Sequence, residues 1–151
     1  EETMLTTLST SSASALGGVQ VNSIWGSVAS IENTAYDDYL VIHPLDNSIG
    51  YAEYQLAGAY QVFSAILAQA VYAITPGMCG DDQFGWFAVV YADGEEVWRS
   101  DYHHLRGHSH AQSFAVDVSG VSVLRLETVS QGTHGCDWPT FFDPKLIVCS
   151  T

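Results

Sequence analysis

The segment from Asp101 to Gln112, DYHHLRGHSHAQ, has the clearest capacity for chemistry, because it holds four of the six histidines in the chain. Neutral imidazole is a common ligand of zinc and copper. His108 and His110 would share one face of an extended segment, and His134 would be a third ligand. The spacing matches no fixed zinc motif. We interpret the segment as a loop at a binding site. A zinc or copper centre and a simple solvated loop are the alternatives.

Acidic residues offer a second kind of metal site. Asp81, Asp82 and Asp143 carry the oxygen ligands that calcium prefers. However, the chain has 17 acidic residues against 4 basic ones and a net charge of -13, so an acidic loop is more often solvated. We expect no required cofactor, with a structural calcium as the alternative.

Catalytic motifs are missing from the sequence. It has no GxSxG elbow and no glycine-rich phosphate loop after a strand. Its candidate carboxylates fall in or beside expected strands, so no pair flanks a cleft among the loops; they are Glu53, Glu95, Glu96 and Glu127. We predict that the protein is not an enzyme.

The elements that must position these residues are predicted to be strands. Runs of β-branched and aromatic residues alternate with polar ones and are bounded by glycine and proline. Asp93-Gly94 suits a tight hairpin turn, and Ser119-Gly120 repeats the pattern. Segment 60–74 is ambiguous between helix and strand, and we predict a strand. The sequence therefore predicts an all-β fold, an antiparallel β-sandwich of the jelly-roll type. The expected strands cover residues 19–25, 51–56, 60–74, 83–100, 113–129 and 143–148.

The order of turns and loops predicts where a binding site would lie. If each strand crosses the sandwich once, the tight turns lie at one end and the long connections 43–50, 73–83, 101–112 and 130–143 lie at the other. Loops on a rigid scaffold commonly carry binding residues. This loop end would collect all six histidines together with Cys79, Cys136, Asp81, Asp82, Asp137 and Trp138.

The composition of the chain narrows the range of possible binding partners. A net charge of -13 repels nucleic acid and anionic lipid, and no apolar run reaches the roughly 18 residues of a membrane span. The chain starts at Glu1 without a basic leader, which we interpret as a secreted, extracellular protein whose signal peptide has been removed. In that compartment a disulfide between Cys79 and Cys136 is expected, and Cys149 is left over.

Several segments, in their order and spacing, resemble a known family. IHPLDNSIGYAEYQLAGAYQVFSA, VVYADGEEVWRS, VDVSGVSVLRL, DW and DPKLI, from His43 to Val148, are similar to the NPCBM-type carbohydrate-binding modules of family 51. The resemblance implies a galactose-binding-like sandwich that binds sugars through its end loops, and some members hold a structural calcium. It implies a non-catalytic module with a galactose-like ligand.

The resemblance also implies ligand residues. The histidine before the first matching strand is His43, and the Asp-Trp pair of the last long loop is Asp137 and Trp138. An indole face can stack on a pyranose while the adjacent carboxylate accepts from sugar hydroxyls. The alternative is a core tryptophan beside an aspartate that caps a turn. His134, Tyr102 and His104, from the same end loops, complete the predicted set.

Residues 1–18, EETMLTTLSTSSASALGG, have the composition of a flexible arm before the domain at 19–151. Met4, Leu5 and Leu8 would anchor the arm, Gly17-Gly18 would be its hinge, and its Ser and Thr would suit O-glycosylation. Such an arm can pair with another copy and propagate head to tail. The alternative function is therefore a self-assembling subunit of an extracellular filament or coat.

Overall fold

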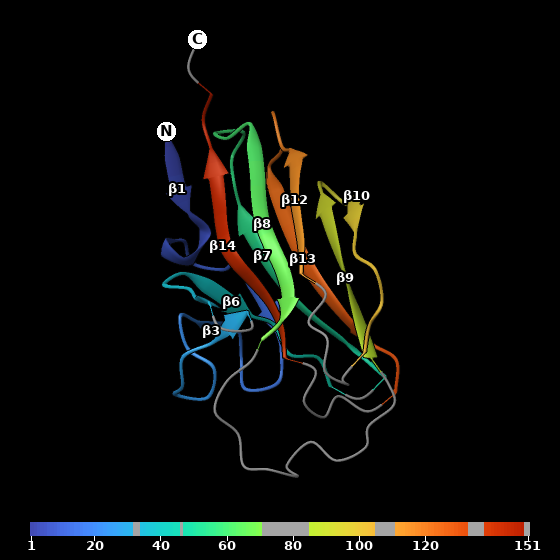
Figure 1. Cartoon of the computed structure of the whole chain (residues 1–151). Helices are drawn as coiled ribbons and strands as arrows, with labels where there is room; N and C mark the ends of the chain where they lie inside the picture. Colours follow the sequence, from blue (N-terminus) through green and yellow to red (C-terminus); the bar gives the residue numbers. More distant parts are fainter. Residues whose placement is uncertain (32–33, 46, 71–84, 105–110, 133–137, 150–151) are drawn as a thin grey trace.

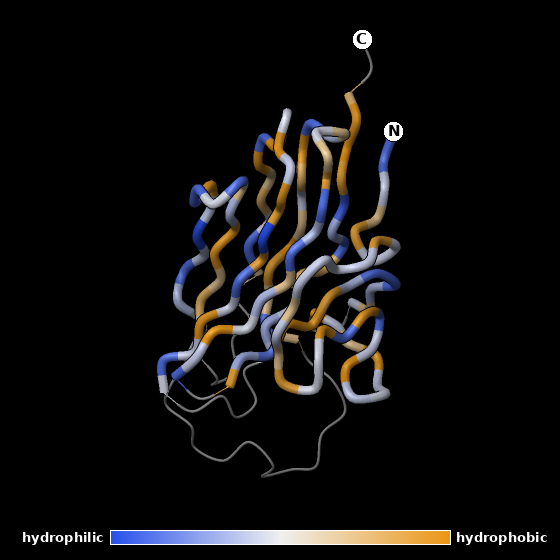
Figure 2. The backbone as a smooth tube through the Cα atoms, turned by 180° about the vertical axis from the view of Figure 1, so that it is seen from behind, coloured by the Kyte–Doolittle hydropathy of each residue, from blue (hydrophilic) through white to orange (hydrophobic). Residues whose placement is uncertain are grey.

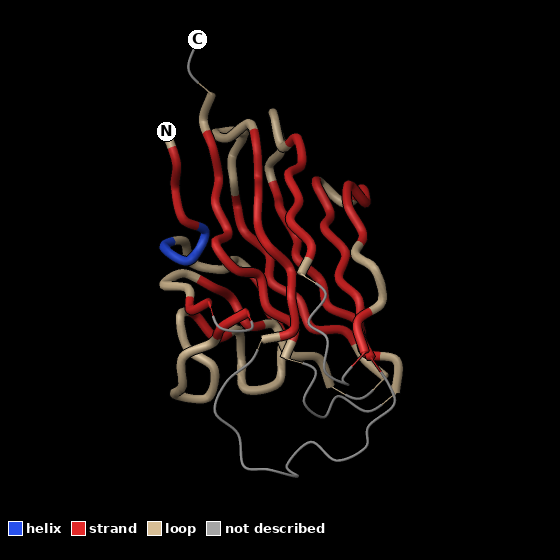
Figure 3. The backbone as a smooth tube through the Cα atoms, viewed as in Figure 1, coloured by secondary structure: helices blue, strands red, loops and turns tan. Residues whose placement is uncertain are grey.

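The structure of the chain is a computed structural model, and it describes residues 1–31, 34–45, 47–70, 85–104, 111–132 and 138–149. Strands dominate these ranges, and their one helical element is a single 3₁₀ turn, Leu5–Thr7 (Figure 3). No helix among the described residues is long and apolar enough to cross a membrane. The all-β prediction is confirmed.

Two six-stranded antiparallel sheets form a sandwich (Figure 1). The first has the order β12-β8-β14-β6-β3, with β1 also paired to β14, and the second has the order β10-β9-β13-β7-β2, with β11 also paired to β9. A separate small hairpin joins β4 and β5. The bounds are β1 Glu2–Met4, β2 Ser12–Ser14, β3 Gln20–Val21, β4 Ser30–Ile31, β5 Thr34–Ala35, β6 Tyr39–Val41, β7 Ile49–Gln55, β8 Val62–Gln69, β9 Gly85–Ala92, β10 Glu95–Arg99, β11 His103–His104, β12 Gln112–Asp117, β13 Val123–Ser130 and β14 Pro139–Ile147.

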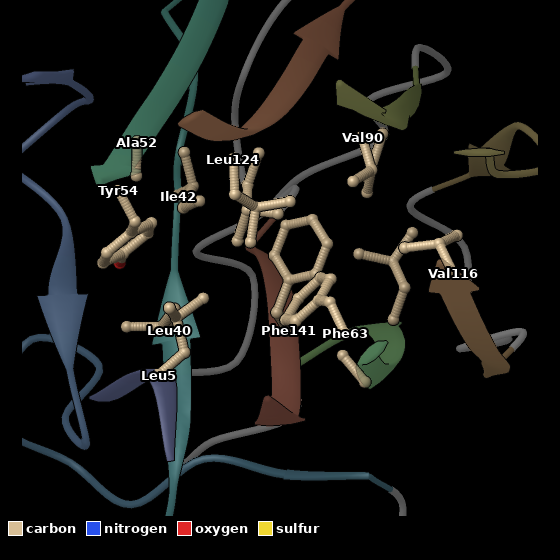
Figure 4. Packing of buried hydrophobic residues seen from close by; sticks show 14 of the residues in the cluster. Leu5, Leu40, Ile42, Ala52, Tyr54, Phe63, Val90, Val116, Leu124 and Phe141 are labelled. Carbon is tan, nitrogen blue, oxygen red and sulfur yellow. The ribbon is translucent and has the colours of Figure 1, made fainter. Parts of the chain in front are cut away.

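The period-two pattern explains how the strands face the core. In β7, Ala52 and Tyr54 are buried, whereas Glu53 between them points to the other face. The ambiguous segment contains β8 and follows the same rule, because Phe63 and Leu67 are fully buried. The alternation is visible along the strands in Figure 2. These inward side chains form one large cluster between the sheets (Figure 4).

The two glycine turns differ. At Asp93-Gly94 both residues have positive φ (48° and 84°), and β9 and β10 form the predicted hairpin. At Ser119-Gly120 the flanking strands belong to different sheets, because β12 pairs with β8 and β13 pairs with β7 and β9. This second turn is a connection between sheets and not a hairpin, because the hydrogen-bonding partners of β12 and β13 come from elsewhere in the chain.

The first eighteen residues are part of the sandwich, so the prediction of an arm that lies on another copy is wrong. Strand β1 pairs with the far half of β14, with Thr3 opposite Leu146, and β2 pairs with β7, with Ala13 opposite Ala52. Strand β6 covers only the near half of β14, from Thr140 to Phe142. The segment therefore satisfies backbone groups that its own domain would otherwise leave unpaired.

Two of the three expected assembly anchors, Leu5 and Leu8, pack in the core of their own domain. Leu5 is fully buried beside Leu40 (Figure 4), Leu8 packs against the same cluster, and Met4 lies in β1. The expected hinge is a turn, in which the Gly18 N–H donates to the Ala15 carbonyl at 2.9 Å. Burial of these apolar side chains inside their own domain removes the basis for the filament alternative.

Candidate functional site

The long connections leave from one end of the sandwich, as the order of turns predicts. In the second sheet, Trp86 near the start of β9 lies opposite Ser130 at the end of β13 and opposite His103 of β11. In the first sheet, Pro139 at the start of β14 lies opposite Gln69 at the end of β8. We call this the loop end, and it is the lower end in Figure 1.

The tight turns meet at the opposite end. A Cβ atom built on Gly58 would lie 3.9 Å from Cα of Gly120. The carboxylate of Asp93 accepts from the backbone N–H groups of Ser122 (3.0 Å) and Val123 (2.8 Å).

His43 lies at the loop end, two residues after β6, and is only 2% exposed. Its Nδ1 is 2.9 Å from the Pro44 carbonyl, which can only accept, so Nδ1 carries the proton. Its own carbonyl accepts from the Leu16 N–H at 2.7 Å. The backbone is crowded there, because a Cβ on Gly50 would lie 3.3 Å from the carbonyl carbon of His43. The imidazole is firmly held and offers almost no surface of its own to a ligand.

Tyr102 and His104 also lie at the loop end, but near β9 rather than β6. The Tyr102 hydroxyl oxygen accepts from the Gly85 N–H at 2.8 Å, and His104 lies opposite Gly85 in the β11–β9 pairing. Strands β9 and β6 lie on opposite sides of the sandwich in Figure 1. The structure therefore positions Tyr102 and the backbone of His104 against β9, whereas His43 follows β6.

Trp138 belongs to the interior. It is 8% exposed and packs in a second, smaller cluster with Ile24, Tyr39 and Phe142. The backbone at Trp138 has a φ of 41° immediately before β14 begins. This arrangement matches the alternative interpretation of a core tryptophan, and it does not fit an indole that presents an open face to a sugar.

Most of the other predicted site residues lie outside the described residues; they are Asp81, Asp82, His108, His110, His134, Asp137 and the cysteines Cys79 and Cys136. Asp143 is described. It lies at an irregularity in β14 and forms an ion pair with Lys145 at 3.3 Å. In the part of the chain that the structure describes, no three His, Cys, Asp or Glu residues converge to hold a metal. Cys149 is an exposed free thiol.

Sequence reasoning missed Trp25, which the structure places against His43. The two ring centroids are 5.5 Å apart at an interplanar angle of 81°, and Trp25 is 45% exposed. Segment 19–25 was predicted to be one strand, but β3 covers only Gln20–Val21 and Trp25 lies in a turn. The signal that could have located this turn is the Trp25-Gly26 pair, because glycine favours the positive φ of a tight turn.

A groove of about 340 Å³ lies elsewhere, on the outer face of the second sheet. Arg125 Nε donates to Glu127 at 2.8 Å, and its Nη1 lies 3.5 Å from Glu53 Oε2. Its guanidinium lies 3.8 Å from the Tyr51 ring centroid. Burial lowers the pKa of Arg125, but the hydrogen bonds and charges of Glu127 and Glu53 together outweigh this effect, so the pKa is raised overall. Glu53 and Glu127 therefore flank a groove on the strands and not among the end loops, and both carboxylates pair with the Arg125 guanidinium.

The chain belongs to the NPCBM/NEW2 domain family, whose profile matches residues 2–147. The match includes the first forty residues, which the sequence resemblance had left out, and this agrees with the pairing of β1 and β2 inside the domain. No curated protein sequence matches the chain significantly.

Solved structures share the fold. The CBM51 module of a GH95 protein from Clostridium perfringens, solved with methyl-galactose, has a TM-score of 0.75 and 24% identity, with 97% of this chain and 100% of that one covered. CBM51-2 of ZmpB from the same organism, solved with GlcNAc, has a TM-score of 0.73 and 19% identity, with 97% and 31% covered. The tandem CBM51 modules of a family 98 glycoside hydrolase from Streptococcus pneumoniae give 0.78 and 16%, with 100% and 48% covered. The chain thus spans the whole of one of these structures and less than half of the other two.

Proposed function

We propose that the protein is a non-catalytic carbohydrate-binding module that binds a neutral, galactose-like sugar at its loop end. The observation that carries this proposal is the match of the NPCBM/NEW2 profile to nearly the whole chain, residues 2–147. Two similar structures were solved with methyl-galactose and with GlcNAc, which indicates the class of ligand to test. The net charge of -13 disfavours anionic glycans.

The site is expected to bind weakly. A monosaccharide has few heavy atoms, and its hydroxyl groups must lose water on binding. At about 0.3 kcal/mol per heavy atom, a methyl hexoside of about 13 atoms binds with roughly 4 kcal/mol, which corresponds to a Kd near 1 mM. Tight binding by such a module would require several linked sites.

The protein is proposed to act outside the cell, in keeping with the kind of enzyme to which similar modules belong, such as a glycoside hydrolase. A disulfide between Cys79 and Cys136 and a structural calcium at Asp81 and Asp82 are further proposals for this location. Mass mapping of non-reduced peptides and elemental analysis of the purified protein test them. Free Cys79 and Cys136 thiols from oxidising medium, or a protein without bound calcium, would contradict the respective proposal.

A glycan array followed by isothermal titration calorimetry tests the function. Methyl-galactose and GlcNAc are the first ligands to titrate, with a urea-unfolded sample as the control for non-specific heat. Binding of a neutral sugar in the millimolar range, absent after unfolding, is the expected result. A folded protein that binds no glycan on the array would overturn the proposal.

A further inference from the structure

We infer that Trp25 is the aromatic platform on which the sugar stacks, a role that the sequence had assigned to Trp138. This inference rests on the proposed function and names the residue that carries it. A stacking platform must be exposed, held in place and located at the loop end. Trp25 is 45% exposed, whereas Trp138 is 8% exposed and packed in the interior.

Trp25 reaches the loop end through the pairing of β3 with β6. Gln20 lies opposite Val41, so the start of β3 is next to the end of β6 from which His43 follows. The side-chain oxygen of Gln20 then accepts from the Trp25 N–H at 2.6 Å, which draws the turn back toward this end. The indole consequently lies beside His43, 18 positions along the chain.

The turn that presents Trp25 is tight and well fastened. Ile24 and Ser27 exchange both backbone hydrogen bonds, at 3.0 and 2.9 Å, around Trp25 and Gly26. Ile24 is fully buried and fixes the turn to the core, and the Gly26 N–H donates to the Ser23 hydroxyl at 3.1 Å. The side chain is thus carried on a rigid support, which reduces the entropy lost on binding.

Backbone strain at Trp25 points in the same direction. Its φ is 46° and that of Gly26 is 81°, the pattern of a two-residue turn in which asparagine and glycine are preferred at the first position. A bulky residue there is rare, because its Cβ crowds the backbone. Strained residues of this kind persist where the surroundings fix them, and they gather at binding sites. Stability does not explain a tryptophan at this position, but presentation of an exposed ring does.

The ring contact leaves an indole face for a ligand. His43 and Trp25 meet edge to face, so the imidazole covers at most one face of the indole. His43 is in turn fixed by its hydrogen bond to Pro44. His43 is therefore a positioning residue that supports the platform, and its own burial is consistent with that role.

The chemistry of an indole face selects the ligand class. The face carries partial negative charge and attracts the weakly positive C–H groups of a pyranose ring. In galactose the axial hydroxyl leaves a continuous strip of C–H groups on one face of the ring. Trp25 should therefore favour galactose over N-acetylglucosamine.

Trp25→Asn is the decisive variant, because asparagine suits this turn and should keep it folded. The matched control is Val28→Ala, which truncates a side chain of the same segment that is 66% exposed. Calorimetry with methyl-galactose should show at least a tenfold loss of affinity for Trp25→Asn and none for the control. The melting temperature of Trp25→Asn should equal or exceed that of the wild type. In the wild type, the indole N–H NMR signal that disappears in the variant should shift as methyl-galactose is added.

The outcomes separate this inference from the proposed function. Wild type and Trp25→Asn that bind methyl-galactose equally would overturn the role of Trp25 and leave the function standing. An indole N–H signal of Trp25 that does not shift at saturating sugar would likewise overturn the role of Trp25 and leave the proposed function standing, even if the variant were poorly folded. A wild-type protein that binds no glycan would overturn both the role of Trp25 and the proposed function.

Discussion

Replacing Leu5 with alanine tests whether the first residues belong to the core of their own domain. Leu5 is fully buried in the 3₁₀ turn between β1 and β2, and it lies beside Leu40 of β6 (Figure 4). Truncation of a buried leucine removes transfer free energy and leaves a cavity, at a cost of about 2–5 kcal/mol. Because domains of this kind are stable by only about 5–15 kcal/mol, the loss is a large fraction of the total.

The expected magnitude is about 3 kcal/mol. For a domain of this length each kcal/mol lowers the melting temperature by about 2–4 °C, so Leu5→Ala should melt roughly 6–12 °C below the wild type. Urea unfolding followed by tryptophan fluorescence measures the free energy, and the slope against urea should stay unchanged. Val28→Ala, at a residue 66% exposed, should stay within about 0.5 kcal/mol of the wild type.

Deletion of residues 1–16 is the stronger form of the same test. It removes β1 and β2 together, and it opens backbone groups of β14 and β7 as well as the core around Leu5. The truncated chain should unfold or aggregate. A truncated protein that is a stable monomer, or a Leu5→Ala variant with wild-type stability, would refute the assignment of this segment to the core.

Three other changes test the packing around the loop end and the core. Thr128→Val should cost about 1–3 kcal/mol in urea unfolding, because the buried Thr128 hydroxyl donates to the Ile42 carbonyl at 2.7 Å and its loss leaves that oxygen unpaired; unchanged stability would contradict this. Gly50→Ala should cost about 1–3 kcal/mol in the same assay, since the new Cβ would lie 3.0 Å from Thr128 Oγ1 and 3.2 Å from Ile42 Cγ2. Burial raises the pKa of Tyr54 from 10.0 to about 12, so the folded state favours its neutral form. The resulting stability is complete below pH 10 and is lost as the pH rises toward 12, by up to about 3 kcal/mol; Tyr54→Phe should reduce this alkaline loss, and a variant whose pH profile equals that of the wild type would count against it.

The sequence by itself determined the features that depend on local pattern. Period-two alternation located β7, because side chains on a strand point to alternate faces whatever the strand pairs with, and the expected strand in 60–74 contains β8, Val62–Gln69. Asp93-Gly94 predicted its hairpin, since positive φ at both positions is a property of the turn itself. The loop end followed from the order of these elements along the chain.

Only the tertiary structure decided which residues are buried and which strands are neighbours. Ser119-Gly120 resembles Asp93-Gly94 locally, yet its strands belong to different sheets. The first residues have the composition of a flexible arm, but they are held by β14 and β7, more than a hundred positions away in one case.

The two tryptophans show the physical reason most directly. Trp138 and Trp25 are the same residue type in turn-like surroundings, but one is enclosed by Ile24 and Phe142 and the other projects beside His43. The exposure of a tryptophan is set by the side chains that the fold brings around it from distant segments. The residue type alone does not reveal which side chains these are. The candidate platform therefore became visible only when β3 was seen paired with β6.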